Sequence, residues 1–414
     1  MQVEANKVYV SAERLWDSLM DMAAIGPGVA GGCNRQALTD EDKQGRDLFV
    51  RWAQEAGCHI MVDELGNIFA RRDGIVSDAS PVLAGSHLDT QPTGGRFDGV
   101  YGVLAGLEVV RSLNDHGIST PRPIEIAVWT NEEGCRFSPA MLGSGVVCGT
   151  YTRDFAYSRQ DRDGNRFGDE LARIGYRGSA PATPRKLAAA FEAHIEQGPI
   201  LEQEGIRIGV VTGIQGAYWL DIALEGVPCH AGPTPMRMRK DPWRAATRII
   251  DRAYALIDRH QPDGRLTIGD AKVLPGSRNT SPSRVTFSVD IRHPEAGTLE
   301  RLVVGLQALA EEICAEYGIG LQFARVWHMP PTRFDERLTT VIEQATAACG
   351  YSHRRMVSGA GHDSLHVAQY APTAMIFVPC AGGLSHNEAE SATASDLAAG
   401  ANVLFHAMIQ VAAT

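Results

Sequence analysis

The sequence predicts an α/β protein built from two domains. Of its 414 residues, 44% are hydrophobic and 21% are charged, a composition that supports a large buried core and argues against disorder. Segments with helical periodicity alternate with short apolar runs, which is the pattern of strands that are covered by helices. The chain is too long for one ordinary domain, and its pattern changes near Gly213 and again near Pro330.

Helices and short strands alternate from the N-terminus onward. Thr39, with Asp42 three residues later, is typical of a helix N-terminus, and the helical pattern that follows ends at Gly57. A strand pair around Ile60 and Ile68 is expected next, split by a Gly-Asn turn.

Two apolar runs, at 81–85 and 124–129, are each followed by polar residues, SHLDT and TNEEG. In an open α/β sheet the ligand crevice lies beyond the carboxyl ends of the strands, so we expect the chemistry at these two segments. Residues 151–190 show little periodicity and predict a mixture of helix and surface loop.

A second pattern, of strands and two longer helices, begins after Gly213 and predicts a self-contained α+β insertion. We expect it to end near Pro330 and Pro331, after which a helix, a strand and a helix return to the first domain. The expected elements of the insertion are strands at 217–224, at 285–291 and near 321, and helices at 242–260 and 295–317.

Composition also bears on partners and location. The formal net charge of −10 gives no electrostatic footprint for nucleic acid, and the basic cluster at 237–240 is short. Eight cysteines lie far apart without a Cys-x-x-Cys pair, which favours reduced thiols over a disulfide framework. Without an apolar run long enough to span a membrane, we expect a soluble, cytoplasmic protein that binds no membrane.

Five side chains spread over the sequence have the chemistry of a metal centre. Three imidazoles and two carboxylates are too many for one four-coordinate ion with an open position, and enough for two ions that share a carboxylate. We expect two divalent metal ions per subunit, zinc, manganese, cobalt or nickel, because imidazole and carboxylate ligands suit all four. The candidate ligands are His87, Asp98, Glu133, His194 and His386.

The segment GSHLDTQPTGGRFDGVYG contains two of these ligands. His87 and Asp89 point to the same side of an extended segment, so the Asp89 carboxylate either binds the far nitrogen of the imidazole or steers a neighbouring group. Asp98 follows a glycine loop at the expected start of a helix, where a carboxylate can bridge two cations. A strand-end histidine and a helix-capping aspartate are the alternative interpretation.

Two adjacent acidic residues, Glu132 and Glu133, follow the apolar strand at 124–129. Paired carboxylates repel each other unless cations hold them, and neighbouring side chains point different ways, so one can bind metal while the other faces the attacking water. We assign Glu133 to metal and Glu132 to the general base and acid. A solvated acidic turn is the alternative.

The chain resembles the hydantoinase/carbamoylase branch of the M20 metallopeptidase superfamily, from about residue 25 to residue 400. The resemblance is carried by GSHLDTQPTGGRFDGVYG, NEEGCRF, AHIEQGPILE, CHAGPTPM, PGSRNTSP, DIRHPE, GAGHDS and GGLSHNEAE. It implies a zinc-peptidase-like α/β/α catalytic domain, residues 1–213 and 331–414, with a smaller α+β dimerisation or lid domain, residues 214–330, inserted into it. The short QPTGGRF spacer favours this branch over the peptidases, which usually carry a longer insertion there.

The resemblance also implies a role for each matching residue. Asp89 would orient His87, and Glu132 would be the proton shuttle. A cis peptide bond after Asp98 is implied as well, although such bonds are costly outside proline. The implied division of ligands is His87 and His194 on one metal, Glu133 and His386 on the other, and Asp98 bridging both.

The remaining motifs fit a small anionic substrate. Arg292 is a natural bidentate partner for a carboxylate, but it could instead form a structural ion pair with Asp290 or Glu295. Asn279 could bind the same carboxylate or the ureido group, or simply cap a turn. His230 is the expected oxyanion donor, and the resemblance suggests that it is contributed across a homodimer. Further candidates for substrate binding are Gln197, Gly361 and His362, with Asp363 beside them.

The expected reaction is hydrolysis of the carbamoyl C–N bond of an N-carbamoyl-L-amino acid to amino acid, ammonia and carbon dioxide. Bound metals lower the pKa of a water from about 15.7 to about 7, and Glu132 would take its proton and return it to the leaving amine. Allantoate amidohydrolase and beta-ureidopropionase are close alternatives. More distant ones are an M20 dipeptidase or aminoacylase, and a non-catalytic binding protein of the same fold.

Overall fold

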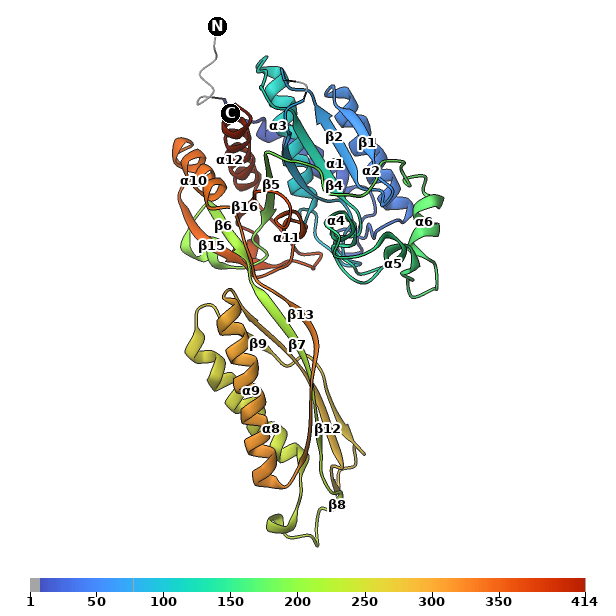
Figure 1. Ribbon diagram of the computed structural model, residues 1–414, viewed down its shortest axis with the longest axis vertical. Helices are drawn as coiled ribbons and strands as arrows, with labels where there is room; N and C mark the ends of the chain where they lie inside the picture. The colour runs from blue at the N-terminus through green and yellow to red at the C-terminus, as the bar shows by residue number, and fades with distance from the viewer. Residues whose placement is uncertain (1–7, 77, 414) are drawn as a thin grey trace. The chain divides into compact units, whose positions relative to one another are not determined.

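The computed structural model describes residues 8–76 and 78–413, which form two compact units (Figure 1). The first unit contains the chain up to Gly213 and again from Arg333, and the second runs from Ile214 to Thr332. Among the helices of the described residues, none combines the length and the apolar character of a membrane span. All eight cysteines lie in the described part of the chain and are free thiols.

The first unit consists of one large sheet with helices on its faces. Its elements are α1 (Ala12–Ala23), α2 (Asp40–Glu55), β1 (His59–Val62), β2 (Ile68–Arg72), β3 (Val82–His87), α3 (Val100–Asp115), β4 (Ile124–Trp129), α4 (Leu142–Val147), α5 (Arg153–Ser158), α6 (Phe167–Arg173), β5 (Ala189–Ile195), α7 (Ile200–Glu204), β6 (Ile208–Ile214), β14 (Thr332–Arg333), α10 (Glu336–Ala348), β15 (His353–Ser358), α11 (Ser364–Val367), β16 (Thr373–Val378), the 3-10 helix η4 (Ala381–Gly383) and α12 (Ala394–Ala412).

The nine-stranded sheet of this unit is parallel at its centre and antiparallel towards its edges. Its strand order is β1-β2-β4-β3-β5-β16-β6-β14, and β15 pairs with β6. β3 runs parallel to both β4 and β5, and β5 runs parallel to β16. The carboxyl ends of these four strands therefore meet at one edge of the sheet, where the sequence predicts the chemistry.

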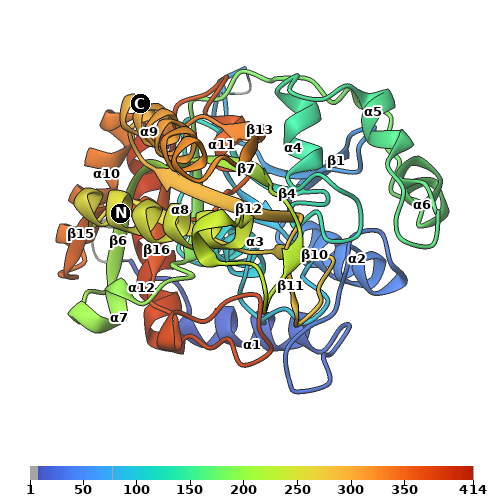
Figure 2. The ribbon, with the colours of Figure 1, turned by 90° about the horizontal axis from the view of Figure 1, so that it is seen from below.

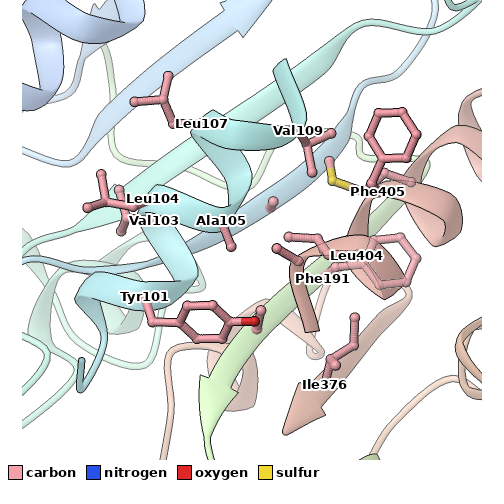
Figure 3. Close-up of a cluster of buried hydrophobic side chains, with 14 of the residues drawn as sticks. Tyr101, Val103, Leu104, Ala105, Leu107, Val109, Phe191, Ile376, Leu404 and Phe405 are labelled. Carbon is pink, nitrogen blue, oxygen red and sulfur yellow. The ribbon is translucent and has the colours of Figure 1, made fainter. Parts of the chain in front are cut away.

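Side chains of the central strands alternate between two cores, one on each face of the sheet. Ile126 and Phe191 belong to the core formed with α1, α3 and α12, while Ala127 and Trp129 belong to the core formed with α4 and α6. Figure 3 shows side chains of α3 and α12 around Phe191, including Tyr101, whose buried hydroxyl donates to the Leu397 carbonyl at 2.8 Å. The α/β/α layering expected of this part of the chain is confirmed.

Local sequence signals account for the elements that carry the site. The Thr39 hydroxyl accepts the amide of Asp42 at 3.2 Å and caps α2, which confirms the predicted helix start. The two apolar runs form β3 and β4, and α3 begins at Val100, directly after the segment that holds Asp98. As a result, candidate ligands lie at strand ends and at a helix start.

The second unit is an antiparallel sheet with two helices packed on it, and its expected α+β character is confirmed. Its elements are β7 (Gly216–Glu225), β8 (Cys229–His230), η2 (Met236–Met238), α8 (Pro242–Ile257), η3 (Asp258–His260), β9 (Arg265–Thr267), β10 (Ala271–Leu274), β11 (Thr280–Ser281), β12 (Arg284–His293), α9 (Ala296–Tyr317) and β13 (Gly320–Met329).

The sheet of the second unit has the strand order β10-β12-β7-β13, with β9 also paired to β12. Every second residue of β12 is buried, which is the alternation of a sheet with only one covered face. Helices α8 and α9 lie side by side on that face, as Figure 2 shows, and supply the rest of the core.

Candidate metal centre

The five predicted ligands converge at the carboxyl edge of the central sheet. His87 is the last residue of β3, His194 lies near the end of β5, and Glu133 follows β4 by a few residues. Asp98 precedes α3, and His386 lies in the loop between η4 and α12. Segments far apart in the sequence thus meet because parallel strands present the same end to one edge.

These ligands form two groups that share Asp98, and within each group the candidate ligand atoms lie within 4.8 Å of one another. In the first group, the Nε2 atoms of His87 and His194 lie 3.7 Å and 3.1 Å from Asp98 Oδ1. In the second group, His386 Nε2 lies 3.5 Å from Asp98 Oδ2 and 3.3 Å from Glu133 Oε2. This is the division of ligands that the resemblance implies.

The two buried histidines are oriented by backbone carbonyls. His87 Nδ1 donates to the carbonyl of Asp89 at 2.8 Å, and His194 Nδ1 donates to the carbonyl of Ile195 at 2.9 Å. Each bond fixes the ring and directs Nε2 towards Asp98, as is usual for imidazoles that bind metal.

Burial and the charge of Asp98 together determine which groups of the centre are ionised. Burial lowers the pKa of His87 to about 4, so this ring is neutral, the form in which imidazole binds a metal. Burial also disfavours a charged His194, but the hydrogen bond and charge of Asp98 outweigh it and raise its pKa to about 9. Burial alone would raise the pKa of Asp98. The hydrogen bond and the charge of His194 outweigh burial, hold this pKa below its usual range and keep the carboxylate ionised.

The paired glutamates are not a solvated turn, because their side chains are 10% and 4% exposed for Glu132 and Glu133. Burial first, and then nearby carboxylates, raise the pKa of both well above the usual value. Such crowding of buried acids is what a bound cation would relieve. Gln91 holds Glu133 with its backbone amide at 3.2 Å and its side-chain amide at 2.7 Å, whereas Glu132 Oε2 lies 3.5 Å from His87 Nε2.

The Asp89 carboxylate steers a neighbouring segment, and it is the Asp89 backbone carbonyl that orients His87. The two carboxylate oxygens of Asp89 accept the backbone amides of Glu132 and Glu133, each at 3.3 Å. The reason is that β3 ends at His87, so the alternation that would place both side chains on one side no longer applies two residues later.

The peptide bond after Asp98 is trans, contrary to the cis bond that the resemblance implies, since the cis bonds of the described residues all precede proline. Gly99 takes a positive φ of 68°, and its amide nitrogen lies 3.1 Å from His194 Nε2. A trans bond is the form that the peptide unit favours outside proline.

Two of the predicted substrate residues lie beside the ligands. Gln197 donates through Nε2 to Asp98 Oδ2 at 2.8 Å, while its Oε1 is buried without a hydrogen-bond partner. The buried ring of His362 packs edge-on against His194 with a centroid distance of 4.6 Å, and its Nε2 lies 3.0 Å from the Ser358 hydroxyl. Gly361 precedes it, where an added Cβ would lie 3.1 Å from the Met141 methyl group.

The other substrate candidates belong to the second unit. Arg292 forms two bonds of 2.8 Å with the Asp290 carboxylate, which is one of the ion pairs considered as its alternative role. Asn279 accepts the Ser277 hydroxyl at 2.9 Å within a turn, and His230 pairs with Thr280 across the short β8–β11 sheet. Their roles towards a substrate stay predictions.

Two residues at the centre were not singled out by the sequence. The Ser385 hydroxyl lies 2.7 Å from Asp98 Oδ2, and the buried Glu390 accepts the amides of Phe97 and Asp98. The only available signal was their closeness to His386 in the SHNEAE segment.

Comparison with known proteins places the chain in a family. Residues 83–410 match peptidase family M20/M25/M40. An N-carbamoyl-L-amino-acid amidohydrolase of Rhizobium meliloti is 52% identical over 97% of both chains. An allantoate amidohydrolase of Bacillus subtilis is 34% identical over 94% of this chain and 95% of its own.

Solved structures agree with this placement. The crystal structure of a hydantoinase/carbamoylase family amidase from Burkholderia multivorans superimposes with a TM-score of 0.96 at 52% identity, over 98% of this chain and 99% of that one. The chain therefore belongs to peptidase family M20/M25/M40, in its hydantoinase/carbamoylase branch.

Proposed function

We propose that this protein is a metal-dependent amidohydrolase that cleaves the carbamoyl C–N bond of N-carbamoyl-L-amino acids and yields the amino acid, ammonia and carbon dioxide. The observation that carries the proposal is the near full-length identity of 52% with a relative named for this activity. The arrangement of His87, Glu132 and Asp98 at one sheet edge supports it independently, because it joins metal-binding side chains to a buried acid.

The donor set fits two divalent cations. Asp98 offers one carboxylate oxygen to each ligand group, and the three histidines and Glu133 supply imidazole and carboxylate donors that suit zinc, manganese, cobalt or nickel. Bound there, the ions would polarise a carbonyl oxygen and lower the pKa of a water to about 7. His87 and His194 would hold one ion, Glu133 and His386 the other, with Asp98 between them.

Glu132 carries the proton in the proposed reaction. It belongs to neither ligand group, and its Oε2 lies 3.5 Å from His87 Nε2, so its carboxylate is free to act at the same edge. A carboxylate in this position can take a proton from water and give it up again. As the water oxygen bonds to the carbamoyl carbon, Glu132 takes the water proton and delivers it to the leaving nitrogen as the C–N bond breaks. The carbamate that remains then breaks down to carbon dioxide and the second amine.

The second unit would supply the substrate contacts. We assign Arg292 to the substrate carboxylate, Asn279 to the carboxylate or ureido group, and His230 to the oxyanion, where one such donor contributes about 3 kcal/mol in other hydrolases. Gln197, Gly361 and His362 would complete the pocket from the first unit.

We further propose a cytoplasmic homodimer in which His230 of each subunit serves the partner's site. The test is to mix two inactive variants, Glu132→Gln and His230→Ala, under conditions that exchange subunits. A shared site predicts recovered activity, because each mixed dimer then contains one site free of both changes. No recovery in a mixture shown to contain mixed dimers argues against donation across the dimer.

The function is tested by assaying ammonia release from N-carbamoyl-L-amino acids, allantoate, N-carbamoyl-beta-alanine and, by amino-acid release, dipeptides, each with zinc, manganese, cobalt and nickel. We expect turnover of N-carbamoyl-L-amino acids with at least one of these metals and its loss after chelation. Preference for allantoate would instead assign the activity of the Bacillus subtilis relative's name. Turnover of dipeptides alone would refute the carbamoylase proposal.

A further inference from the structure

His386 differs from the other four ligands in how it is supported. Its side chain is 52% exposed, whereas those of Asp98 and Glu133 are 5% and 4% exposed. Its backbone has a positive φ of 53°, a conformation that costs a non-glycine residue of order 1 kcal/mol or more and persists only where the surroundings enforce it. Some contact outside the ligand group must therefore hold this loop.

Glu390, four residues after His386, makes that contact. It is 4% exposed, and its Oε1 accepts the backbone amides of both Phe97 and Asp98, at 2.9 Å and 3.2 Å. One carboxylate oxygen thus ties the His386 loop to the backbone of the ligand that both groups share.

The second oxygen of Glu390 completes the connection. The Ser385 hydroxyl lies 3.1 Å from Glu390 Oε2 and 2.7 Å from Asp98 Oδ2. Ser385 is the residue directly before His386. The loop is therefore joined to the backbone of Asp98 through Glu390 and to the side chain of Asp98 through Ser385.

The space around this carboxylate is closed on the side of the glycine loop. A Cβ built on Gly95 would lie 1.9 Å from Glu390 Cδ and 2.0 Å from Oε1. Only glycine at position 95 therefore leaves room for the carboxylate where it meets the two amides.

We propose that Glu390 is a positioning residue that assembles the Asp98, Glu133 and His386 ligand group by fastening the His386 loop to the Asp98 segment. It acts through the placement of its hydrogen-bond acceptors. This inference rests on the proposed two-metal site. It makes Glu390 and Gly95 determinants of metal occupancy although neither is a ligand.

Two substitutions separate placement from charge. Glu390→Asp keeps the charge but shortens the side chain by one methylene, so the acceptor no longer reaches the two amides. Glu390→Gln removes the charge but keeps an acceptor at Oε1, and its new amide group can donate to Ser385. If Glu390 acts by positioning, Glu390→Asp should bind metal more weakly and Glu390→Gln should bind it about as tightly as the unaltered protein. If only the charge matters, the reverse is expected.

The chain contains a matched control in Glu388. Its carboxylate also accepts backbone amides, those of Ala30 and Gly32, but neither of these residues belongs to the ligand segments. Glu388→Asp shortens an equivalent carboxylate on the same loop, and it should leave metal binding unchanged.

The readout is binding of Co²⁺ to chelator-treated full-length protein, followed by calorimetry and by the visible absorption of the bound ion. We expect two equivalents in the unaltered protein and, in Glu390→Asp, a 10- to 100-fold weaker affinity for one of them, the usual size of an effect on residues that orient ligands. Gly95→Ala, which displaces the carboxylate without altering Glu390, should give the same selective loss. Gly95→Ala also tests the proposal if Glu390→Asp fails to fold.

The outcomes distinguish this inference from the function. If the unaltered protein binds two equivalents and Glu390→Asp or Gly95→Ala binds both as tightly, the positioning role is wrong and the proposed function stands. The same holds if Glu390→Gln is as defective as Glu390→Asp. If the unaltered protein binds fewer than two equivalents, the two-metal site and this inference both fall.

Discussion

The carboxylate of Asp89 accepts the backbone amide of Glu132 at 3.3 Å. Asp89 lies just after β3 and Glu132 just after β4, so the end of one strand holds the proposed base at the end of the other. The second carboxylate oxygen of Asp89 accepts the amide of Glu133, and its backbone carbonyl accepts Nδ1 of His87. Asp89 therefore contacts three residues of the site, Glu132, Glu133 and His87, with three separate oxygens. This explains why it must be both buried and acidic.

Replacing Asp89 by Asn tests that arrangement. Asparagine offers one carbonyl oxygen, and its NH₂ group would face the amide of Glu132 or Glu133, where an acceptor is needed. We expect a loss of roughly 10- to 100-fold in kcat or in metal affinity, the range for residues that orient ligands. Steady-state kinetics and metal titration measure both, and values equal to those of the unaltered protein would show that the loop is held elsewhere.

Replacing Glu132 by Gln removes the proposed proton carrier while keeping the shape of the side chain. Because Glu132 belongs to neither ligand group, metal content and thermal stability should stay unchanged. The expected loss in kcat is roughly 10²- to 10⁴-fold, the contribution typical of a general acid or base. Glu133→Gln is the control, since it should instead lose metal. Full activity of Glu132→Gln would eliminate it as the base.

Replacing Arg292 by Ala tests the proposed carboxylate anchor against its structural alternative. A charge-assisted bond contributes about 1.5–3 kcal/mol, so we expect KM to rise by roughly 10- to 100-fold with metal content unchanged. Asp290→Ala is the control, because it removes the observed partner of Arg292 without removing the guanidinium. If both variants lose stability equally and KM stays constant, Arg292 serves the ion pair only.

The sequence was sufficient for the layers of the fold because each element has a local cause. Thr39 caps its helix, β12 alternates, and the apolar runs became β3 and β4. The clustering of the five candidate ligands was also accessible, since only a few side chain types bind such metals. Which atoms meet was not accessible. The carbonyl of Asp89 rather than its carboxylate contacts His87, because the strand ends at His87. Glu390 reaches the Asp98 amide across 292 residues of chain, a relationship that depends on tertiary packing.

A histidine outside the centre should make the first unit sensitive to acid. His366 is 4% exposed, its ring lies edge-on to Tyr151, and its Nδ1 lies 3.4 Å from both Cys148 Sγ and Thr150 Oγ1. Burial lowers the pKa of His366 from 6.5 to about 4. Below pH 6.5 the unfolded chain therefore takes up a proton that the folded chain refuses until about pH 4. The free energy of unfolding therefore decreases as the pH is lowered through that window, by roughly 1.4 kcal/mol per pH unit.

Urea unfolding at pH 7.5 and pH 5 tests this prediction. Between these pH values the unaltered protein should lose roughly 2 kcal/mol more stability than His366→Gln, which cannot titrate there. Equal losses in the two proteins would mean that His366 is charged in the folded state at pH 5.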